Sequence, residues 1–96
     1  MQIREMIKYS EGGITSRVIQ KGEQNVSLFC MAKDTEMDEH TSTKQGFVYI
    51  LEGEGIFTLE GKKIKMIPGE IIFMDNNAKH SLKAEENTAF LLSLVS

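Results

Sequence analysis

Two histidines, His40 and His80, are the residues of this chain best suited to chemistry. A neutral imidazole nitrogen is a common metal ligand, and an imidazole with an ordinary pKa near 6.5 can accept or donate a proton around neutral pH. The same side chains can also line a pocket and hydrogen-bond a small organic ligand. We favour pocket lining over metal binding, and both over catalysis, because no substrate is indicated and no catalytic residue can be assigned.

Ser42 follows His40 by two residues, which raises the question of a nucleophilic pair. Residues two apart on a strand share a face, but their backbone positions lie about 6.5–7 Å apart. No acidic residue is apparent that would orient the histidine, as a nucleophilic triad requires. We therefore do not assign Ser42 as a nucleophile.

The overall composition argues against several classes of partner. The net charge is −3, the pI is about 5.3, and Lys and Arg never cluster beyond two adjacent residues. Nucleic-acid surfaces and polybasic membrane surfaces need a basic patch. No segment approaches the roughly 18–20 apolar residues of a membrane span, and the start of the chain lacks the apolar stretch of a signal peptide. We expect neither nucleic acid nor membrane as a partner.

The length and the single cysteine bear on organisation and location. A chain of 96 residues is expected to form one domain, residues 1–96. Cys30 is the only cysteine, so no internal disulfide can form, and a reducing compartment such as the cytoplasm is expected. A free cysteine is most often a small buried apolar residue, and that is the expected role of Cys30.

Hydrophobic periodicity predicts an all-β fold. Short runs rich in Ile, Val, Phe and Thr are separated by Gly, Asn, Asp or Pro. No window of a dozen residues keeps a helical period free of Gly, so at most one helical turn is expected. The polar run 33–45 is expected to be a loop or the approach to a strand. Eight short strands, a number typical of a sandwich or barrel, are predicted at 14–20, 26–32, 47–52, 55–60, 62–67, 70–75, 80–85 and 88–95.

The last predicted strand, TAFLLSLV, has two mostly apolar faces. By alternation, one face carries Phe90, Leu92 and Leu94, and the other carries Leu91, Ser93 and Val95. A strand with one face in water explains this pattern poorly. A chain of this size also buries only about 60–65% of its surface when it is alone. We therefore expect a homodimer that covers the second face.

Residues 34–53 resemble the first motif of the cupin superfamily of small jelly-roll barrels. That motif reads Gly, five residues, His-x-His, three or four residues, Glu, six residues, Gly. The first His falls on His40 and the closing Gly on Gly53. Asp34 stands at the opening Gly, Ser42 at the second His and Gly46 at the Glu.

Residues 69–84 resemble the second cupin motif, which reads Gly, five residues, Pro-x-Gly, two residues, His, three residues, Asn. Gly69 and His80 match the motif. The departures at its Pro, Gly and Asn positions are Asp75, Asn77 and Ala84. The fifteen residues between the motifs are the short spacing typical of microbial cupins.

The resemblance implies an all-β, cupin-type jelly-roll barrel of two antiparallel sheets with about eight short strands. Asp34 and Asn77 are compatible with that fold, because Asp and Asn tolerate the turn conformations that Gly supplies. In cupins the motif histidines converge inside the barrel, so His40 and His80 are expected to meet there. Ser42, Gly46 and Val48 are expected to line the same pocket.

The resemblance implies the metal site of metal-bearing cupins, in which three His and one Glu surround Fe, Mn, Ni, Zn or Cu. This chain keeps His40 and His80 as metal ligands but lacks the third imidazole and the carboxylate. Catalytic zinc and non-haem iron sites usually have three protein ligands. A rescuing ligand would have to come from elsewhere. Asp38 shares a strand face with His40 by parity, whereas the direction of Cys30 is open.

Three functions follow from the resemblance. The favoured one is a cupin barrel that binds a small molecule, with metal binding absent or weak and no cofactor firmly predicted. The first alternative is a metal-dependent dioxygenase- or isomerase-type enzyme that uses His40, His80 and a further ligand. The second alternative is a non-catalytic structural or regulatory dimer.

Overall fold

The computed structural model describes residues 1–95, which form one 3-10 turn and nine strands. The turn, η1, spans Ile3–Met6, so the expectation of at most one helical turn is confirmed within this range. The strands are β1 (Ile14–Gln20), β2 (Gln24–Met31), β3 (Glu36–His40), β4 (Gly46–Glu52), β5 (Gly55–Leu59), β6 (Lys62–Met66), β7 (Ile71–Met74), β8 (His80–Ala84) and β9 (Thr88–Val95).

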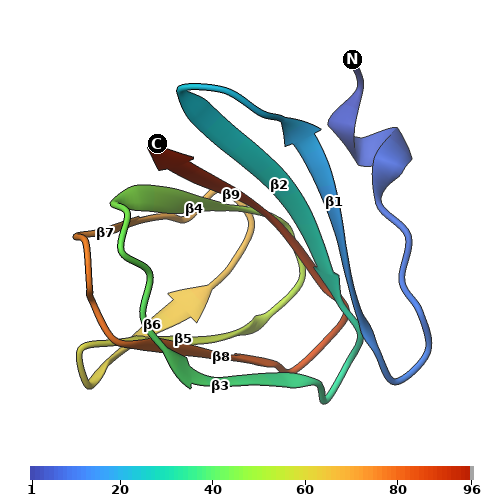
Figure 1. Ribbon diagram of the computed structural model, residues 1–96. Helices are drawn as coiled ribbons and strands as arrows, with labels where there is room; N and C mark the ends of the chain where they lie inside the picture. The colour runs from blue at the N-terminus through green and yellow to red at the C-terminus, as the bar shows by residue number, and fades with distance from the viewer. Residues whose placement is uncertain (96) are drawn as a thin grey trace.

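The strands form two antiparallel sheets that face each other across the core (Figure 1). The larger sheet has the order β1-β2-β9-β4-β7, and the smaller has the order β3-β8-β5-β6. Chain-distant strands therefore become neighbours: β9 lies between β2 and β4, and β8 lies between β3 and β5. The predicted all-β architecture of two antiparallel sheets is confirmed.

Strand β3 is a ninth strand, beyond the eight predicted runs, and lies in the polar run that we expected to be a loop or the approach to a strand. Met37 is the only apolar residue in this strand, so the sequence offers no alternating signal there. The strand forms because β8 supplies a template: Glu36 pairs with Lys83 and Met37 with Leu82. An ion pair of 3.8 Å between Lys83 Nζ and Glu36 Oε1 accompanies this pairing.

The space between the sheets is filled by a continuous apolar cluster. One face of β9 contributes Phe90, Leu92 and Leu94 to it, as the alternation predicted. Phe29 and Phe90 stack within the cluster, with ring centroids 5.2 Å apart. The fully buried members include Met31, Val48, Ile50, Phe57 and Met66.

Two turn positions confirm that non-glycine residues replace the motif glycines. Asp34 has φ of 69° and Asn77 has φ of 65°, both in the left-handed region. Asn and Asp adopt this region more readily than other non-glycine residues. The fold therefore tolerates both departures from the cupin motifs.

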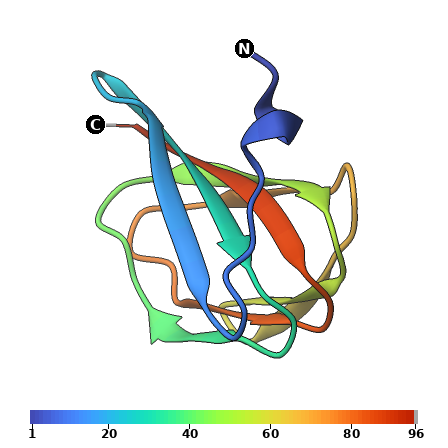
Figure 2. The same cartoon turned by 90° about the vertical axis from the view of Figure 1, so that its right-hand side faces the viewer.

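The N-terminal segment covers part of the outer face of the larger sheet (Figure 2). A second buried cluster that includes Cys30 lies there, and the residues packed against it are Leu91 of β9 and, from the N-terminal segment, Ile3, Met6, Ile7 and Tyr9. The Tyr9 hydroxyl donates to Glu52 Oε2 at 2.7 Å, and Arg4 donates from Nη2 to the Leu51 carbonyl at 3.1 Å. Burial, followed by the hydrogen bond to Glu52, raises the pKa of Tyr9. The second apolar face of β9 is thus partly covered by the chain itself.

Cys30 is 2% exposed in this outer cluster, which confirms its expected role as a small buried residue. Within residues 1–95, no helix is long and apolar enough to cross a membrane.

Candidate functional site

The structure brings His40 and His80 together at one end of the barrel. His40 ends β3, His80 begins β8, and the two residues are directly paired across the strands. Their ring centroids lie 4.1 Å apart, with an interplanar angle of 65° and an edge-on contact. The pairing of β3 with β8 therefore joins two residues that are forty positions apart in the sequence.

Backbone carbonyls orient both imidazoles. His40 Nδ1 lies 2.7 Å from the Asp38 carbonyl oxygen, and His80 Nδ1 lies 3.0 Å from the Ala78 carbonyl oxygen. A carbonyl oxygen only accepts, so in each neutral ring Nδ1 carries the proton and donates it. The lone pair of each Nε2 is then free for a ligand. Histidines that bind metals are held in the same way.

His80 is kept in its neutral form by its surroundings. The residue is 7% exposed, and Phe57 stacks on its ring with centroids 5.8 Å apart. Burial lowers the pKa of His80, and the proximity of His40 lowers this pKa further, against the raising effect of the Ala78 carbonyl. A neutral imidazole at physiological pH offers Nε2 as a hydrogen-bond acceptor or a metal ligand.

The two histidines lie on a cavity of about 100 Å³ inside the barrel. The other lining residues are apolar and come from both sheets. They are Phe29, Met37, Val48, Phe57, Met74, Leu82, Phe90 and Leu92. The arrangement is an apolar pocket with one polar corner, which is the usual composition of a small-ligand site.

The expected pocket residues fall in different places. Val48 lines the cavity together with His40 and His80, whereas Ser42 and Gly46 are not among the lining residues. Ser42 lies in the loop after β3, where its Oγ accepts from the Lys44 backbone N–H at 3.2 Å. Its carbonyl accepts from the Asn77 backbone N–H at 2.6 Å. Ser42 therefore stabilises the loop at this end of the barrel.

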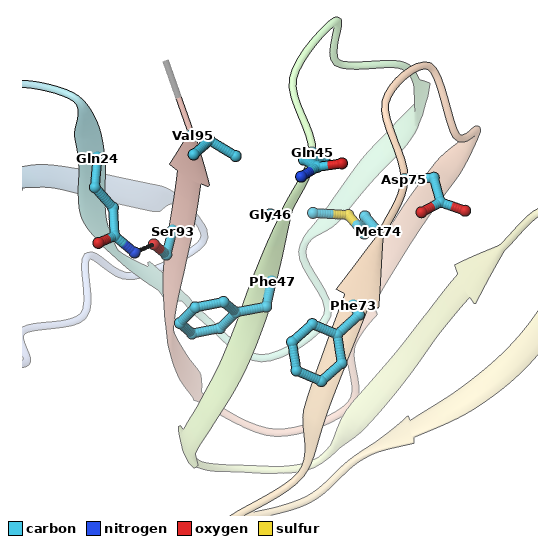
Figure 3. Close-up of a pocket in the computed structure, with 9 residues that line it drawn as sticks. All are labelled: Gln24, Gln45, Gly46, Phe47, Phe73, Met74, Asp75, Ser93 and Val95. Atoms are coloured by element: carbon cyan, nitrogen blue, oxygen red, sulfur yellow. Dashed lines mark hydrogen bonds between the residues drawn. The ribbon is translucent and has the colours of Figure 1, made fainter.

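Gly46 lines a groove of about 340 Å³ on the outside of the larger sheet (Figure 3). A Cβ built at this position would collide with the carbonyl oxygen of Ser93 on β9. The backbone of β4 thus approaches β9 too closely for any side chain at 46. This close approach explains why the carboxylate that the family has at this motif position could not be accommodated on the present backbone.

The other ligands considered from sequence also lie away from the cavity. Asp38 lines a groove on the smaller sheet, and neither His40 nor His80 is among the residues that line this groove. Cys30 belongs to the outer cluster beneath the N-terminal segment. Within residues 1–95, no three His, Cys, Asp or Glu residues lie close enough to hold a metal ion. The residues present do not fit the three-histidine, one-glutamate cage of a divalent metal.

A β-bulge explains why parity misplaced Asp38. The pairing shifts between Met37–Leu82 and His40–His80, so two residues on β3 (38 and 39) lie opposite one residue on β8 (81). An extra residue in one strand reverses the alternation beyond it. Met37 and His40 therefore line the same cavity although they are three residues apart.

Sequence reasoning did not single out the two methionines of the cavity, Met37 and Met74. Met74 could have been found by alternation, because it follows Ile72 by two residues on a strand with one buried face. Met37 carried no such signal, because the bulge that redirects it has no recognisable sequence pattern here.

Comparison with known proteins places the chain in a family. The profile of the Cupin domain family matches residues 27–95. The chain belongs to the cupin family. No match was found among curated proteins.

Several solved cupin-like structures are similar to this cupin. A conserved protein of unknown function from Streptococcus pyogenes has a TM-score of 0.89 and 24% identity, over 100% of this chain and 85% of that one. A cupin 2 conserved barrel domain protein from Leptotrichia buccalis has a TM-score of 0.91 and 30% identity, over 100% of this chain but 47% of that one.

An enzyme is also among the similar structures. A salicylate 1,2-dioxygenase variant from Pseudoaminobacter salicylatoxidans has a TM-score of 0.80 and 15% identity, over 88% of this chain and 26% of that one. At this identity the similarity concerns the cupin fold alone.

Proposed function

We propose that this cupin, in its metal-free form, binds a small organic molecule in the barrel cavity. The supporting observation is the pair of imidazoles whose Nδ1 atoms are anchored by backbone carbonyls. Each ring then presents Nε2, a good hydrogen-bond acceptor, beside an otherwise apolar cavity. The ligand is therefore an apolar molecule that carries an O–H or N–H donor.

The cavity volume limits the size of this ligand. Typical ligand pockets measure about 300–1,000 Å³, whereas this cavity measures about 100 Å³. An engineered apolar cavity of about 150 Å³ accepts benzene. A ligand with only a few non-hydrogen atoms, or one whose tail protrudes past the exposed His40, fits this space.

The charge of the ligand is limited by the same walls. Among the described residues that line the cavity, none is Lys, Arg, Asp or Glu. A charged ligand would lose its hydration without gaining a partner, which carries a large free-energy cost. A neutral alcohol, phenol or amide is therefore preferred over a carboxylate or an ammonium.

Binding can be tested with neutral fragments and protein-observed NMR, using phenol, cyclohexanol and the matched hydrocarbon methylcyclohexane. We expect phenol or cyclohexanol to shift the resonances of the cavity residues, and the hydrocarbon to bind more weakly. His40→Ala should weaken binding of the donor fragments by roughly 3–10-fold, because a hydrogen bond contributes about 1 kcal/mol. Equal binding of donor and hydrocarbon, unchanged by this substitution, would contradict the proposal.

The metal-dependent enzyme alternative is not supported by the donor set, because a divalent ion would have only two imidazoles. The similar dioxygenase structure supports the fold and not the activity. A structural or regulatory role remains compatible with the cupin fold, which hosts unrelated functions. If the folded wild-type protein bound none of the fragments, that result would favour the structural or regulatory role.

We also propose a homodimer, with its interface on β4 and β7 rather than on β9. The outer face of these two strands carries the exposed side chains of Tyr49, Ile71 and Phe73 beside the half-buried Phe47. The rings of Phe47 and Phe73 contact each other, with centroids 5.9 Å apart. A contiguous exposed apolar patch is typical of an interaction site, and a second copy presents the same patch. A cytoplasmic location remains a prediction based on the single buried cysteine.

A further inference from the structure

Two thioethers share the barrel cavity with the two imidazoles. Met37 and Met74 line the same space of about 100 Å³ as His40 and His80. Met74 is 5% exposed and belongs to the core, and Met37 packs against that core. Their sulfur atoms are the only soft donors among the described residues that line the cavity.

The two methionines reach the cavity from different strands. Met37 precedes His40 on β3, and the bulge between them turns both toward the cavity. Met74 ends β7 and is paired with Gly46 of β4. Figure 3 shows the Met74 side chain extending from β7 toward Gly46, where no side chain is present. A thioether thus lies beside the position at which the family motif has its carboxylate.

The donor set has a clear preference among metal ions. Two imidazole nitrogens and two thioether sulfurs are neutral, and thioethers select Cu(I) over hard divalent ions. An apolar cavity with no carboxylate also disfavours a double positive charge more strongly than a single one. The side chains that line this cavity offer hard ions such as Mn(II), Fe(II) or Mg(II) none of the oxygen ligands that these ions prefer.

We infer that His40, His80, Met37 and Met74 form a binding site for Cu(I). The Nε2 atoms of both histidines and the sulfur atoms of both methionines are the ligands. His40 is exposed, so the ion can reach the cavity from solvent at this end of the barrel. The inference uses the same cavity as the proposed organic ligand, so the ion and that ligand exclude each other.

Cys30 is the other soft donor that could capture Cu(I), and the structure separates it from this site. Its side chain lies in the outer cluster under the N-terminal segment, on the opposite face of the larger sheet. Met66 is a useful second reference, because it is fully buried in the core but does not line the cavity. Cys30→Ser and Met66→Leu are therefore matched controls for the two cavity methionines.

The test titrates the purified 96-residue chain with Cu(I), without oxygen, against a chromophoric Cu(I) chelator of known affinity. We expect one Cu(I) per chain and copper X-ray absorption that shows both nitrogen and sulfur neighbours. Met37→Leu and Met74→Leu should each lower the affinity at least tenfold, as removal of even an outer partner of a metal ligand costs about 10–100-fold. Met→Leu conserves volume, so these variants should keep their fold.

The controls decide between this site and other copper sites. Met66→Leu and Cys30→Ser should leave the Cu(I) affinity unchanged, and His40→Ala should lower it. Loss of Cu(I) in Cys30→Ser, or unchanged affinity in the Met37→Leu/Met74→Leu double variant, would overturn the inference. Fragment binding is measured on copper-free protein, so failure of the Cu(I) site and failure of organic ligand binding are separate results.

Discussion

At the scale of single residues, the candidate site of this cupin is built on two imidazoles held by the backbone. Each ring donates Nδ1–H to the carbonyl of the residue two positions earlier in the chain. The donation leaves Nε2 of both rings as acceptor or ligand. Burial of His80 adds a preference for the neutral ring, so this ring is ready to bind at physiological pH.

The lowered pKa of His80 predicts how stability depends on pH. Below pH about 6.5, the unfolded chain binds a proton at His80 that the folded chain still excludes. The unfolded state then holds more protons, so the free energy of unfolding falls as the pH falls. This part of the stability is fully present above pH 6.5 and is lost progressively below it.

Denaturant unfolding between pH 5 and 8 checks this prediction. We expect the wild-type protein to lose more stability than His80→Gln over this range, since glutamine does not titrate. A direct NMR titration should give a pKa for His80 below 6.5. Parallel stability profiles for the two proteins would contradict the assigned effect of burial.

At the scale of elements, the bulge in β3 determines which residues form the cavity. Alternation along an ideal strand would place Asp38 beside His40, and the extra residue replaces Asp38 with Met37. A single inserted residue thus exchanges a hard carboxylate for a soft thioether at the site. The bulge follows from pairing with β8, so local sequence carries no indication of it.

Much of the fold could be predicted because its signals are local. The runs in β4 and β9 have strong strand periodicity, and Asp34 and Asn77 have the side chains that tolerate left-handed turns. The site was only partly predictable. Motif spacing placed His40 and His80, but it did not place the other residues of the cavity. The position of Gly46 against β9 and the contribution of Met37 depend on tertiary contacts that one sequence does not reveal.

The contact between β4 and β9 predicts a marked cost for any side chain at position 46. Gly46→Ala would place a methyl group against the Ser93 carbonyl, so we expect a loss of about 1–3 kcal/mol in the free energy of unfolding. Gly13→Ala is the matched control, because a Cβ there meets Ser10 at an ordinary contact distance of 3.6 Å.

Urea unfolding of both variants measures the difference. Gly13→Ala should change the stability by less than about 1 kcal/mol. A Gly46→Ala protein as stable as the wild type would show that β4 can move away from β9. In that case the missing carboxylate could be restored at position 46.

At the scale of the whole molecule, the chain covers one outer face with its own N-terminal segment and leaves another exposed. The segment shields Leu91 and Cys30, whereas Phe73 on β7 remains 69% exposed and Tyr49 on β4 remains 38% exposed. This asymmetry is the reason for placing the proposed dimer interface at the β4 and β7 end of the larger sheet.

Phe73→Lys tests the proposed dimer. We expect size-exclusion chromatography with light scattering to give the mass of two chains for the wild type at micromolar concentration. The variant should give the 10.8 kDa of one chain, since a lysine in the patch would bury a charge. Val18→Lys, on the exposed edge strand β1, is a control that should leave the dimer intact. A monomeric wild-type protein at this concentration would exclude the dimer.

The way in which His40 and His80 are held also bears on how the site can change. The hydrogen bond of each ring runs to a main-chain carbonyl and not to a side chain. Substitutions that keep the backbone and these ring contacts in place therefore preserve the hydrogen bonds that aim the two nitrogens. Exchange of Met37 or Met74 for a glutamate would add a hard ligand to an already aligned pair. A single codon could thus shift this barrel from one class of occupant to another, both in evolution and in the laboratory.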